Sequence, residues 1–188
     1  EIINDLGNTF LAVGDSNTAK NYYQKTLTIN NSYAPALINL GILELKTSNK
    51  QEALSLLIRA TESEPELFPA WRNLANVYFQ IGKLKEAEIA IRKAIDINPN
   101  LFDSHFLLSN ILIRQKKLQE AEQSLCKTIA LKPDFFEAHF NRGSLLKDLG
   151  KLQEAELSTR KAIEINPDLA YAHLGMGEIL ESQNKFKE

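Results

Sequence analysis

One sequence motif recurs at a constant interval along the chain, and this recurrence limits the fold more than any other feature. Residues 150–168 read GKLQEAELSTRKAIEINPD, and residues 82–100 read GKLKEAEIAIRKAIDINPN, with the same residue at 13 of 19 positions. Midway between them, residues 116–134 read KKLQEAEQSLCKTIALKPD. A catalytic centre needs one set of groups in one place, whereas copied units build an extended surface. The motif therefore predicts an array of equivalent structural units.

Individual residues of one type also recur at the interval of the motif, and they show what each unit contains. Within each copy, apolar residues recur at helical spacing in two blocks, such as 68–81 and 84–97. Glycine between the blocks suits a left-handed helix end, and Asn-Pro after the second block ends that helix. Each period therefore predicts an antiparallel pair of helices. The recurring residues are Asn31, Pro65, Pro99, Pro133 and Pro167; Ala19, Ala53, Ala87, Ala121 and Ala155; Gly7, Gly41, Ala75, Ser109, Gly143 and Gly177; and, between the blocks, Gly14, Ser48, Gly82, Lys116, Gly150 and Asn184.

This pattern resembles the tetratricopeptide repeat family over nearly the whole chain. The family's motif is matched in residues 68–101 by Trp71, Leu74, Ala75, Tyr78, Ala87, Ile91, Ala94 and Pro99. The resemblance implies an all-α fold, a right-handed superhelical solenoid of antiparallel helix pairs with five and a half repeats. In such a solenoid the first helices of the pairs line the concave face. Local departures from the motif are Arg142 and Glu44, which replace apolar residues, and Thr26 and Thr128, which replace a late alanine.

The register of the repeats sets the expected organisation of the chain. We expect one solenoid over residues 1–188, with repeats at 1–33, 34–67, 68–101, 102–135 and 136–169 and a partial repeat at 170–188. The partial repeat would supply a first helix without its second. The chain also opens on Glu1 rather than on a methionine, and we therefore expect it to be a piece of a longer protein.

Charge and hydropathy exclude two classes of partner. The formal net charge is −2, with 22 basic and 24 acidic residues well mixed, whereas nucleic-acid surfaces carry a basic excess. No apolar run approaches the roughly 18–20 residues that a bilayer needs, so we expect a soluble chain without membrane insertion. The single cysteine, Cys126, rules out an internal disulfide. It agrees with the reducing cytoplasm but leaves the compartment open.

The sequence predicts neither a catalytic centre nor a metal or cofactor site. His105, His139 and His173 share one repeat position, so about 10 Å or more separates successive rings, too far for a shared ion. Trp71 occupies the same position, which indicates packing. Cys126 lies deep in a second helix, away from the helix N-terminus that would activate a thiol. There is no glycine-rich phosphate loop and no HExxH motif.

The concave face carries the candidate binding residues. In the family, the groove-facing positions of each first helix are the second, fifth, sixth, ninth, twelfth and thirteenth. Those predicted here to bind a ligand are Asn39, Arg72, Asn73, Asn76, Phe79, Phe106, Asn110, Phe140, Asn141 and Lys147. An amide side chain both donates and accepts, so it can pair with a peptide group of any sequence.

Two known uses of this groove in the family match the residues to different degrees. Asn39, Asn73 and Asn141 share one slot, interrupted by Leu107, and this arrangement resembles the substrate-gripping asparagines in the repeats of the O-linked N-acetylglucosamine transferase. The carboxylate clamp that grips acidic chaperone tails fits poorly. Leu107 replaces an asparagine that the clamp needs, and Glu137 stands where it needs a cation.

The leading hypothesis is therefore a non-catalytic protein–protein interaction module that binds an extended peptide or partner segment in its groove. Two alternatives stay open at this point. The chain could be the substrate-recruiting arm of a larger enzyme, such as a glycosyltransferase, or a scaffold that self-associates through the ends of its repeat array. The sequence does not name the partner protein.

Overall fold

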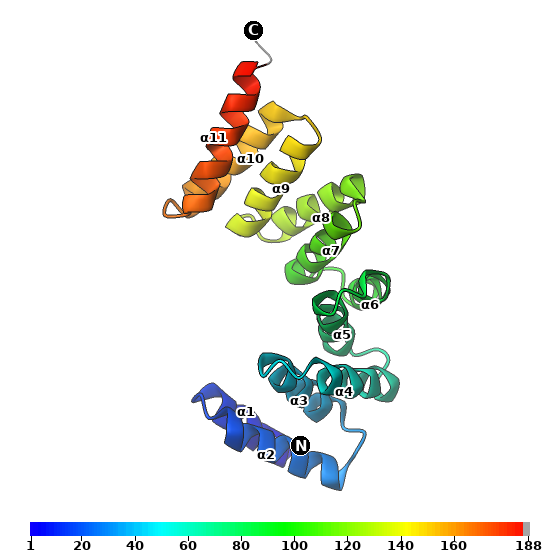
Figure 1. The fold of residues 1–188 in the computed structure, drawn as a ribbon. Helices are drawn as coiled ribbons and strands as arrows, with labels where there is room; N and C mark the ends of the chain where they lie inside the picture. Colours follow the sequence, from blue (N-terminus) through cyan, green and yellow to red (C-terminus); the bar gives the residue numbers. More distant parts are fainter. Residues whose placement is uncertain (186–188) are drawn as a thin grey trace. The chain divides into compact units, whose positions relative to one another are not determined.

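The computed structural model describes residues 1–185, the last two by their backbone alone, and over this range the chain is all α-helical (Figure 1). The end of the predicted partial repeat, residues 186–188, lies outside the described residues. The predicted all-α fold class is confirmed. The helices are α1 (Ile2–Ala12), α2 (Ser16–Ile29), α3 (Ala34–Lys46), α4 (Lys50–Ser63), α5 (Phe68–Gln80), α6 (Leu84–Ile97), α7 (Phe102–Arg114), α8 (Leu118–Leu131), α9 (Phe136–Asp148), α10 (Leu152–Ile165) and α11 (Ala170–Lys185).

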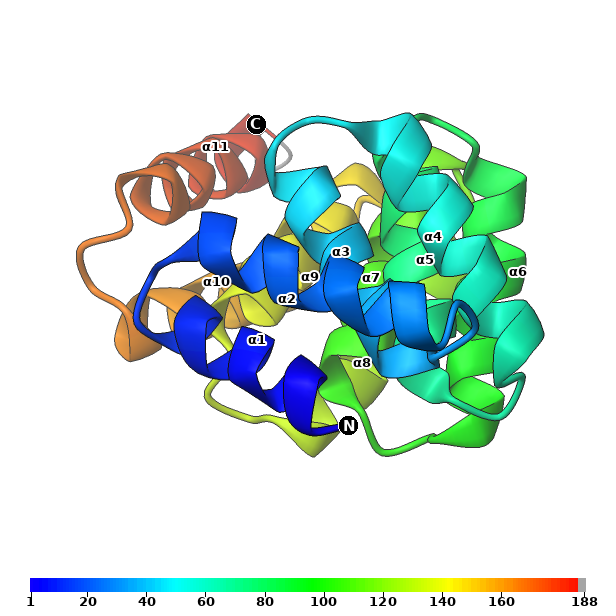
Figure 2. The ribbon, with the colours of Figure 1, turned by 90° about the horizontal axis from the view of Figure 1, so that it is seen from below.

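The helices group into two compact units. Unit 1 is Glu1–Pro99 and holds the pairs α1/α2, α3/α4 and α5/α6. Unit 2 is Asn100–Glu188 and holds the pairs α7/α8 and α9/α10, with α11 packed on α10. Figure 2 shows α1 and α2 side by side as one such pair. The helix pairing predicted from the repeat is confirmed, while the single solenoid over residues 1–188 stays a prediction.

The helix starts keep the interval of the sequence motif. The first helices α3, α5, α7, α9 and α11 begin at residues 34, 68, 102, 136 and 170, as the register predicts. Proline at the second position of α3 and α5 suits a helix start, because the missing N–H has no intrahelical partner there.

The turn inside each pair has one geometry, whatever residue occupies it. Gly14, Gly82 and Gly150 have φ values of 87°, 82° and 75°, and Ser48 and Lys116 reach 65° and 62°. In every case the next residue donates its N–H to a carbonyl near the end of the first helix, at 2.9 Å, which closes the helix end. The two non-glycine residues take a conformation that costs an L-residue about 1–2 kcal/mol. Because the same turn forms at Ser48 and Lys116, the packing of the helix pair outweighs the conformational cost of a positive φ at these two residues.

One turn expected from the register is not formed. Asn184 holds the position of the turn glycine in the sixth copy, yet it lies inside α11, which runs on to Lys185. The expectation of a turn at Asn184 is therefore wrong. The turns that do form each connect a first helix to a packed second helix, and α11 has no second helix within the described residues.

The close approach of paired helices explains the small residues of the motif. An added Cβ at Gly7 would lie 2.5 Å from Tyr23 Cε1, and one at Gly41 would lie 3.0 Å from Leu57 Cγ. A Cβ at Gly143 would overlap Thr159 Oγ1 and stand 3.2 Å from the carbonyl oxygen of the preceding turn of α10. In each case the opposing side chain belongs to the second helix of the same pair, at one equivalent repeat position. The small residue therefore sets the distance between the two helices.

Alanines and large apolar residues fill the remaining interior. Alanine leaves no cavity where two helices touch, and the bulky residues close the space between successive pairs. The recurring alanines Ala19, Ala53, Ala87, Ala121 and Ala155 are all fully buried, as are Tyr23, Leu57, Ile91 and Leu125 of the second helices.

The departures from the motif are each accommodated by polar contacts. Glu44, buried in place of an apolar residue, pairs with Lys20 Nζ at 2.6 Å and accepts a hydrogen bond from Asn49 at 3.0 Å. The hydrogen bond from Lys20 holds the pKa of Glu44 below its usual range. Thr26 and Thr128 donate their hydroxyls to carbonyls one turn earlier in their own helices.

Arg142, in place of a leucine, has three partners from neighbouring helices. Its Nη1 donates to Ser158 Oγ at 2.9 Å, and its Nη2 lies 3.5 Å from Glu122 Oε1 and 3.6 Å from Glu154 Oε2. Glu122 is also paired with Lys151 at 3.1 Å. The positive charge of Arg142 is therefore compensated by carboxylates of the neighbouring helices. The helix pair packs in the same register as the other pairs.

The helix crossing at Gly143 can be tested directly. Gly143→Ala should lower the free energy of unfolding by about 1–3 kcal/mol, because the new methyl overlaps Thr159 and backbone atoms of α10. Gly177→Ala is the matched control, since nothing lies within 4 Å of its added Cβ, and it should stabilise by roughly 0.5–1 kcal/mol. Urea unfolding followed by circular dichroism measures both changes. Equal stabilisation by the two substitutions would contradict the close crossing.

Candidate functional site

The candidate binding residues all lie on first helices. Asn39, Arg72, Asn73, Asn76 and Phe79 lie on α3 and α5 in unit 1, and Phe106, Asn110, Phe140, Asn141 and Lys147 lie on α7 and α9 in unit 2. All ten side chains are half-buried. Such residues are held by neighbours while keeping part of their surface in contact with solvent, which is what a pre-formed binding surface requires.

The asparagines form pairs across successive repeats. In unit 1, Asn39 Nδ2 donates to Asn8 Oδ1 at 2.8 Å and lies 3.4 Å from Asn4 Oδ1. The hydroxyl of Tyr23 also donates to Asn8 Oδ1, at 2.9 Å. In unit 2, Asn141 Nδ2 donates to Asn110 Oδ1 at 3.1 Å. Both pairs join the ninth position of one repeat to the sixth position of the next.

Asn73 makes a different contact because its partner position is apolar. The ninth position of the preceding repeat is Ile42, which offers no acceptor in its side chain. Asn73 Nδ2 donates instead to the carbonyl of Pro69, one turn back in α5, at 2.8 Å. The three asparagines at the sixth repeat position are therefore alike in one respect: each donates its amide N–H to another group of the protein.

The acceptor oxygens of these amides are available for a ligand. Within residues 1–185, no donor reaches Oδ1 of Asn39, Asn73 or Asn141. Each N–H bond to the protein fixes the orientation of the amide plane. The remaining oxygen can then accept a hydrogen bond from a backbone N–H of any sequence.

A hollow in unit 2 adjoins two of the candidate residues. It has a volume of about 230 Å³ and lies among α9, α10 and α11. Phe140 and Tyr171 meet edge to face, with ring centroids 4.6 Å apart. Lys147 Nζ pairs with Glu178 Oε2 at 2.5 Å beside the hollow. Its lining residues are Phe140, Ser144, Lys147, Thr159, Tyr171, Leu174, Gly175, Glu178 and Ile179.

Phe106 belongs to a separate aromatic group in unit 2. Its ring meets Phe135 edge to face at 4.9 Å, and Phe135 meets Phe102 in the same way at 5.2 Å. Lys132 Nζ lies 4.6 Å from the centroid of Phe102. These contacts hold Phe106 in one orientation, so a ligand would meet a rigid ring there.

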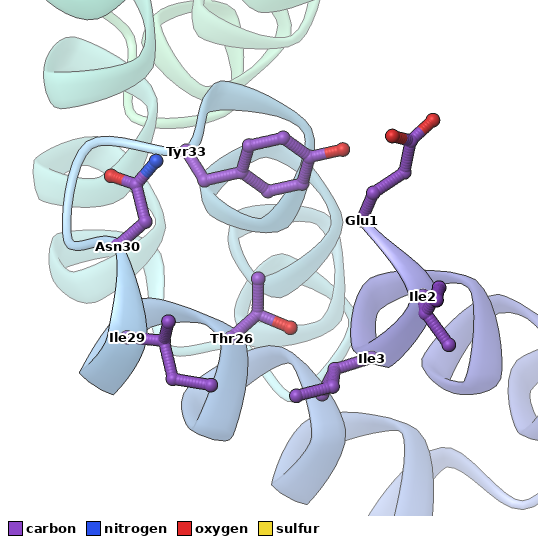
Figure 3. Close-up of a pocket in the computed structure, with 7 residues that line it drawn as sticks. All are labelled: Glu1, Ile2, Ile3, Thr26, Ile29, Asn30 and Tyr33. Carbon is purple, nitrogen blue, oxygen red and sulfur yellow. The ribbon is translucent and has the colours of Figure 1, made fainter.

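A larger apolar hollow lies at the start of unit 1 (Figure 3). It has a volume of about 620 Å³ and is lined by Glu1, Ile2, Ile3, Thr26, Ile29, Asn30 and Tyr33. The phenol of Tyr33 points toward Glu1, and burial raises its pKa, with Glu1 and other carboxylates adding to the effect. Ile2 and Ile29 are 79% and 70% exposed. None of the predicted groove residues lines this hollow.

The repeat position of the histidines has a structural role. Trp71 Nε1 donates to the carbonyl of Pro65 at 2.7 Å, and His139 and His173 bond through Nε2 to the carbonyls of Pro133 and Pro167 at 2.9 and 2.8 Å. A ring nitrogen thus ties the loop before each of these helices to the helix itself. The predicted packing role is confirmed for His139, which is buried, whereas His173 is exposed. The hydrogen bond of each ring to the preceding loop was not predicted from the sequence.

Two negative findings apply to the described residues. They contain no group of three or more histidine, cysteine, aspartate or glutamate side chains placed to hold a metal ion. Among these same residues, none of the helices combines the length and the apolar character that crossing a bilayer requires.

Several residues of the site were missed by the sequence analysis. Asn4 and Asn8 pair with Asn39, and Tyr171, Gly175 and Glu178 line the hollow around Phe140. The signal that could have found the asparagine partners is a second spacing, because Asn8–Asn39 and Asn110–Asn141 are separated by the same interval. Contacts between unlike repeat positions do not show when only equivalent positions of successive repeats are aligned.

The chain matches the family model described as the cilia and flagella-associated protein 70 C-terminal domain, over residues 3–188. The chain belongs to this family. Tetratricopeptide repeat protein 8 from human and from mouse is 30% and 32% identical over 73 residues. That stretch is 39% of this chain and 14% of either relative, so the chain spans only a small part of their length. The resemblance to tetratricopeptide repeats is confirmed.

Solved structures share the fold at low sequence identity. MamA is 24% identical, with a TM-score of 0.78, over 88% of this chain and 96% of that one. YrrB, described as a tetratricopeptide protein with an unusual peptide-binding site, is 22% identical, with a TM-score of 0.77, over 90% and 88%. MamA from Desulfovibrio magneticus RS-1 is 16% identical, with a TM-score of 0.80, over 90% and 96%. These likenesses establish the tetratricopeptide fold of the chain.

Proposed function

We propose that this chain is a non-catalytic interaction module that holds an extended segment of a partner protein against its first helices. The observation that carries the proposal is the set of oriented amides at Asn39, Asn73 and Asn141. Each amide is fixed through its N–H and keeps an acceptor oxygen. Within each unit, such acceptors on the first helices suit a peptide backbone, which offers an N–H at each residue.

The apolar candidates complement the amides. Phe106 and Phe140 are each held by edge-to-face contact with a neighbouring ring, so little side-chain freedom is lost when a ligand packs against them. They would contact side chains of the bound segment and so select among sequences. The amides would supply affinity without selecting, as in the asparagine arrangement of the O-linked N-acetylglucosamine transferase repeats that these residues resemble.

The charges of the site favour a partner segment without a strong net charge. Lys147 is neutralised by Glu178, and Arg142 by Glu122 and Glu154. Binding that depends on neutral hydrogen bonds and apolar contacts should change little with salt. The peptide-binding site named for YrrB, a protein of the same fold, supports a peptide ligand as the class of partner.

The amides can be tested by calorimetric titration. The ligand is a peptide selected on the wild-type chain from a random phage-displayed library. Each of Asn39→Ala, Asn73→Ala and Asn141→Ala should weaken its binding by about 0.5–1.5 kcal/mol, and the triple variant by more than any single one. The loss should recur for selected peptides of unrelated sequence, whereas Phe106→Ala should change which peptides bind best.

The control removes three amides from elsewhere on the chain. Gln51, Gln123 and Gln153 are exposed on the second helices α4, α8 and α10, and their triple alanine variant should bind as the wild type does. Circular dichroism confirms that each variant is folded. A folded triple asparagine variant with unchanged affinity would rule out the amide grip.

A second candidate function is self-association, favoured by the apolar hollow at the start of unit 1. Exposed isoleucines around an open hollow of this kind tend to be covered by another protein surface. We propose that a second copy of the chain covers it.

Sedimentation velocity at increasing concentration tests this second candidate. The wild-type chain should gain mass with concentration, and Ile29→Glu should abolish the gain because it places a charge in the contact. Ile89→Glu is the control, since Ile89 on α6 is 69% exposed, close to the 70% of Ile29, and lies outside the hollow. A wild-type chain that stays monomeric at high concentration would exclude self-association.

A further inference from the structure

We propose that the hollow between α9 and α11 is an anchor subsite that takes one large apolar side chain, such as leucine, methionine or phenylalanine, from the bound partner segment. This inference rests on the proposed function and adds the residue class that the segment must carry. Its basis is a change in the pair of residues that fills one structural slot along the first helices.

The slot joins the ninth position of one repeat to the sixth position of the next. Where both residues are asparagine, as in Asn8–Asn39 and Asn110–Asn141, the two amides meet and fill the space between neighbouring first helices. At the last such slot of unit 2 the residues are Ser144 and Gly175. Both are too small to meet, and the hollow of about 230 Å³ is lined by both of them. The hollow therefore lies at the slot where an amide pair would stand if both residues were asparagine.

Apolar side chains form a large part of the wall of the hollow, and neighbouring side chains support them. Phe140 and Tyr171 brace one another edge to face at 4.6 Å. Ile179, 1% exposed, and the buried Thr159 also line it. Leu174 is 66% exposed, so its side chain offers apolar surface to an incoming ligand. Burial of a leucine-sized group against such walls is favourable and needs no polar partner.

The charges beside the hollow exclude a charged occupant. Lys147 and Glu178 line it and pair with each other at 2.5 Å, so neither offers an uncompensated charge to a ligand. A charged side chain entering the hollow would lose its hydration without gaining an ion pair. The hydroxyl of Ser144 can donate and accept, and it suits the peptide group next to the anchor.

Gly175 keeps the hollow open and supplies the test. A Cβ at Gly175 would stand 3.4 Å from Phe140 Cε2, an ordinary contact distance, so a side chain can be added without overlap. Gly175→Asn places at this position the residue that Asn39, Asn73 and Asn141 supply in three other repeats, and it fills the hollow. Asparagine is also a better helix former than glycine, so the change should not weaken α11.

Gly177→Asn is the matched control on the same helix. Nothing lies within 4 Å of a Cβ at Gly177, and Gly177 does not line the hollow. Both variants introduce the same residue in place of glycine, at positions two residues apart on different faces of α11. They therefore differ only in whether the hollow is filled.

The experiment uses peptides selected on the wild-type chain from a random phage-displayed library, measured by calorimetric titration. The selected peptides should share one large apolar residue, and Gly175→Asn should weaken their binding by about tenfold or more, since a buried leucine-sized side chain contributes that much. Replacing the shared residue by alanine should cost the same on the wild type and nothing further on Gly175→Asn. Gly177→Asn should bind as the wild type does.

The outcomes separate this subsite from the function on which it rests. Peptides that bind wild type and Gly175→Asn equally, but lose affinity for the triple asparagine variant, would overturn the subsite and leave the interaction module standing. Selected peptides without a shared apolar residue would also overturn it. A library that yields no binder at all would overturn both. If Gly175→Asn is not folded, Ser144→Asn fills the same hollow from α9 and makes the same test.

Discussion

The rest of the structure depends on the close contact between the two helices of each pair. A small residue of the first helix faces a larger one in the second, as Gly41 faces Leu57 and Gly7 faces Tyr23. This contact fixes the distance and register of the pair. Because it recurs in successive repeats, each first helix within a unit carries its side chains at equivalent places. The candidate binding surface is then a consequence of packing, and its chemistry varies by substitution at fixed positions.

The same logic explains why the candidate site is a series of slots rather than one pocket. Within a unit, successive first helices bring the ninth position of one repeat to the sixth position of the next, and the residue pair at each slot decides what forms there. Two asparagines form an amide pair, as Asn110 and Asn141 do. Where Ile42 holds the ninth position, the amide of Asn73 donates instead to its own helix. Ser144 at a ninth position and Gly175 at the next sixth position leave a hollow. Under the proposed function, one backbone geometry would support both hydrogen-bonding and apolar subsites.

Most of the fold was predictable from the sequence because repetition multiplies a weak local signal. The helix starts, the buried alanines and the left-handed turns at Ser48 and Lys116 all follow from the constant interval. The end of α11 did not follow, because a turn at Asn184 needs a packed second helix to define it. The residues of the candidate site could be named from their positions. Their partners could not, since a hydrogen bond such as Asn39 to Asn8 depends on side-chain orientation and on a spacing different from the repeat.

The central claim is that ligands bind to the first helices, and nuclear magnetic resonance tests it most directly. A uniformly ¹⁵N-labelled chain is titrated with a peptide selected from a random library, and shifts are followed for backbone amides and for the side-chain amides of asparagine. The account predicts that the side-chain amides of Asn39 and Asn141 and the backbone of α3, α5, α7 and α9 respond. Shifts concentrated instead around the exposed Ile89 and Leu157, on the second helices α6 and α10, would contradict it.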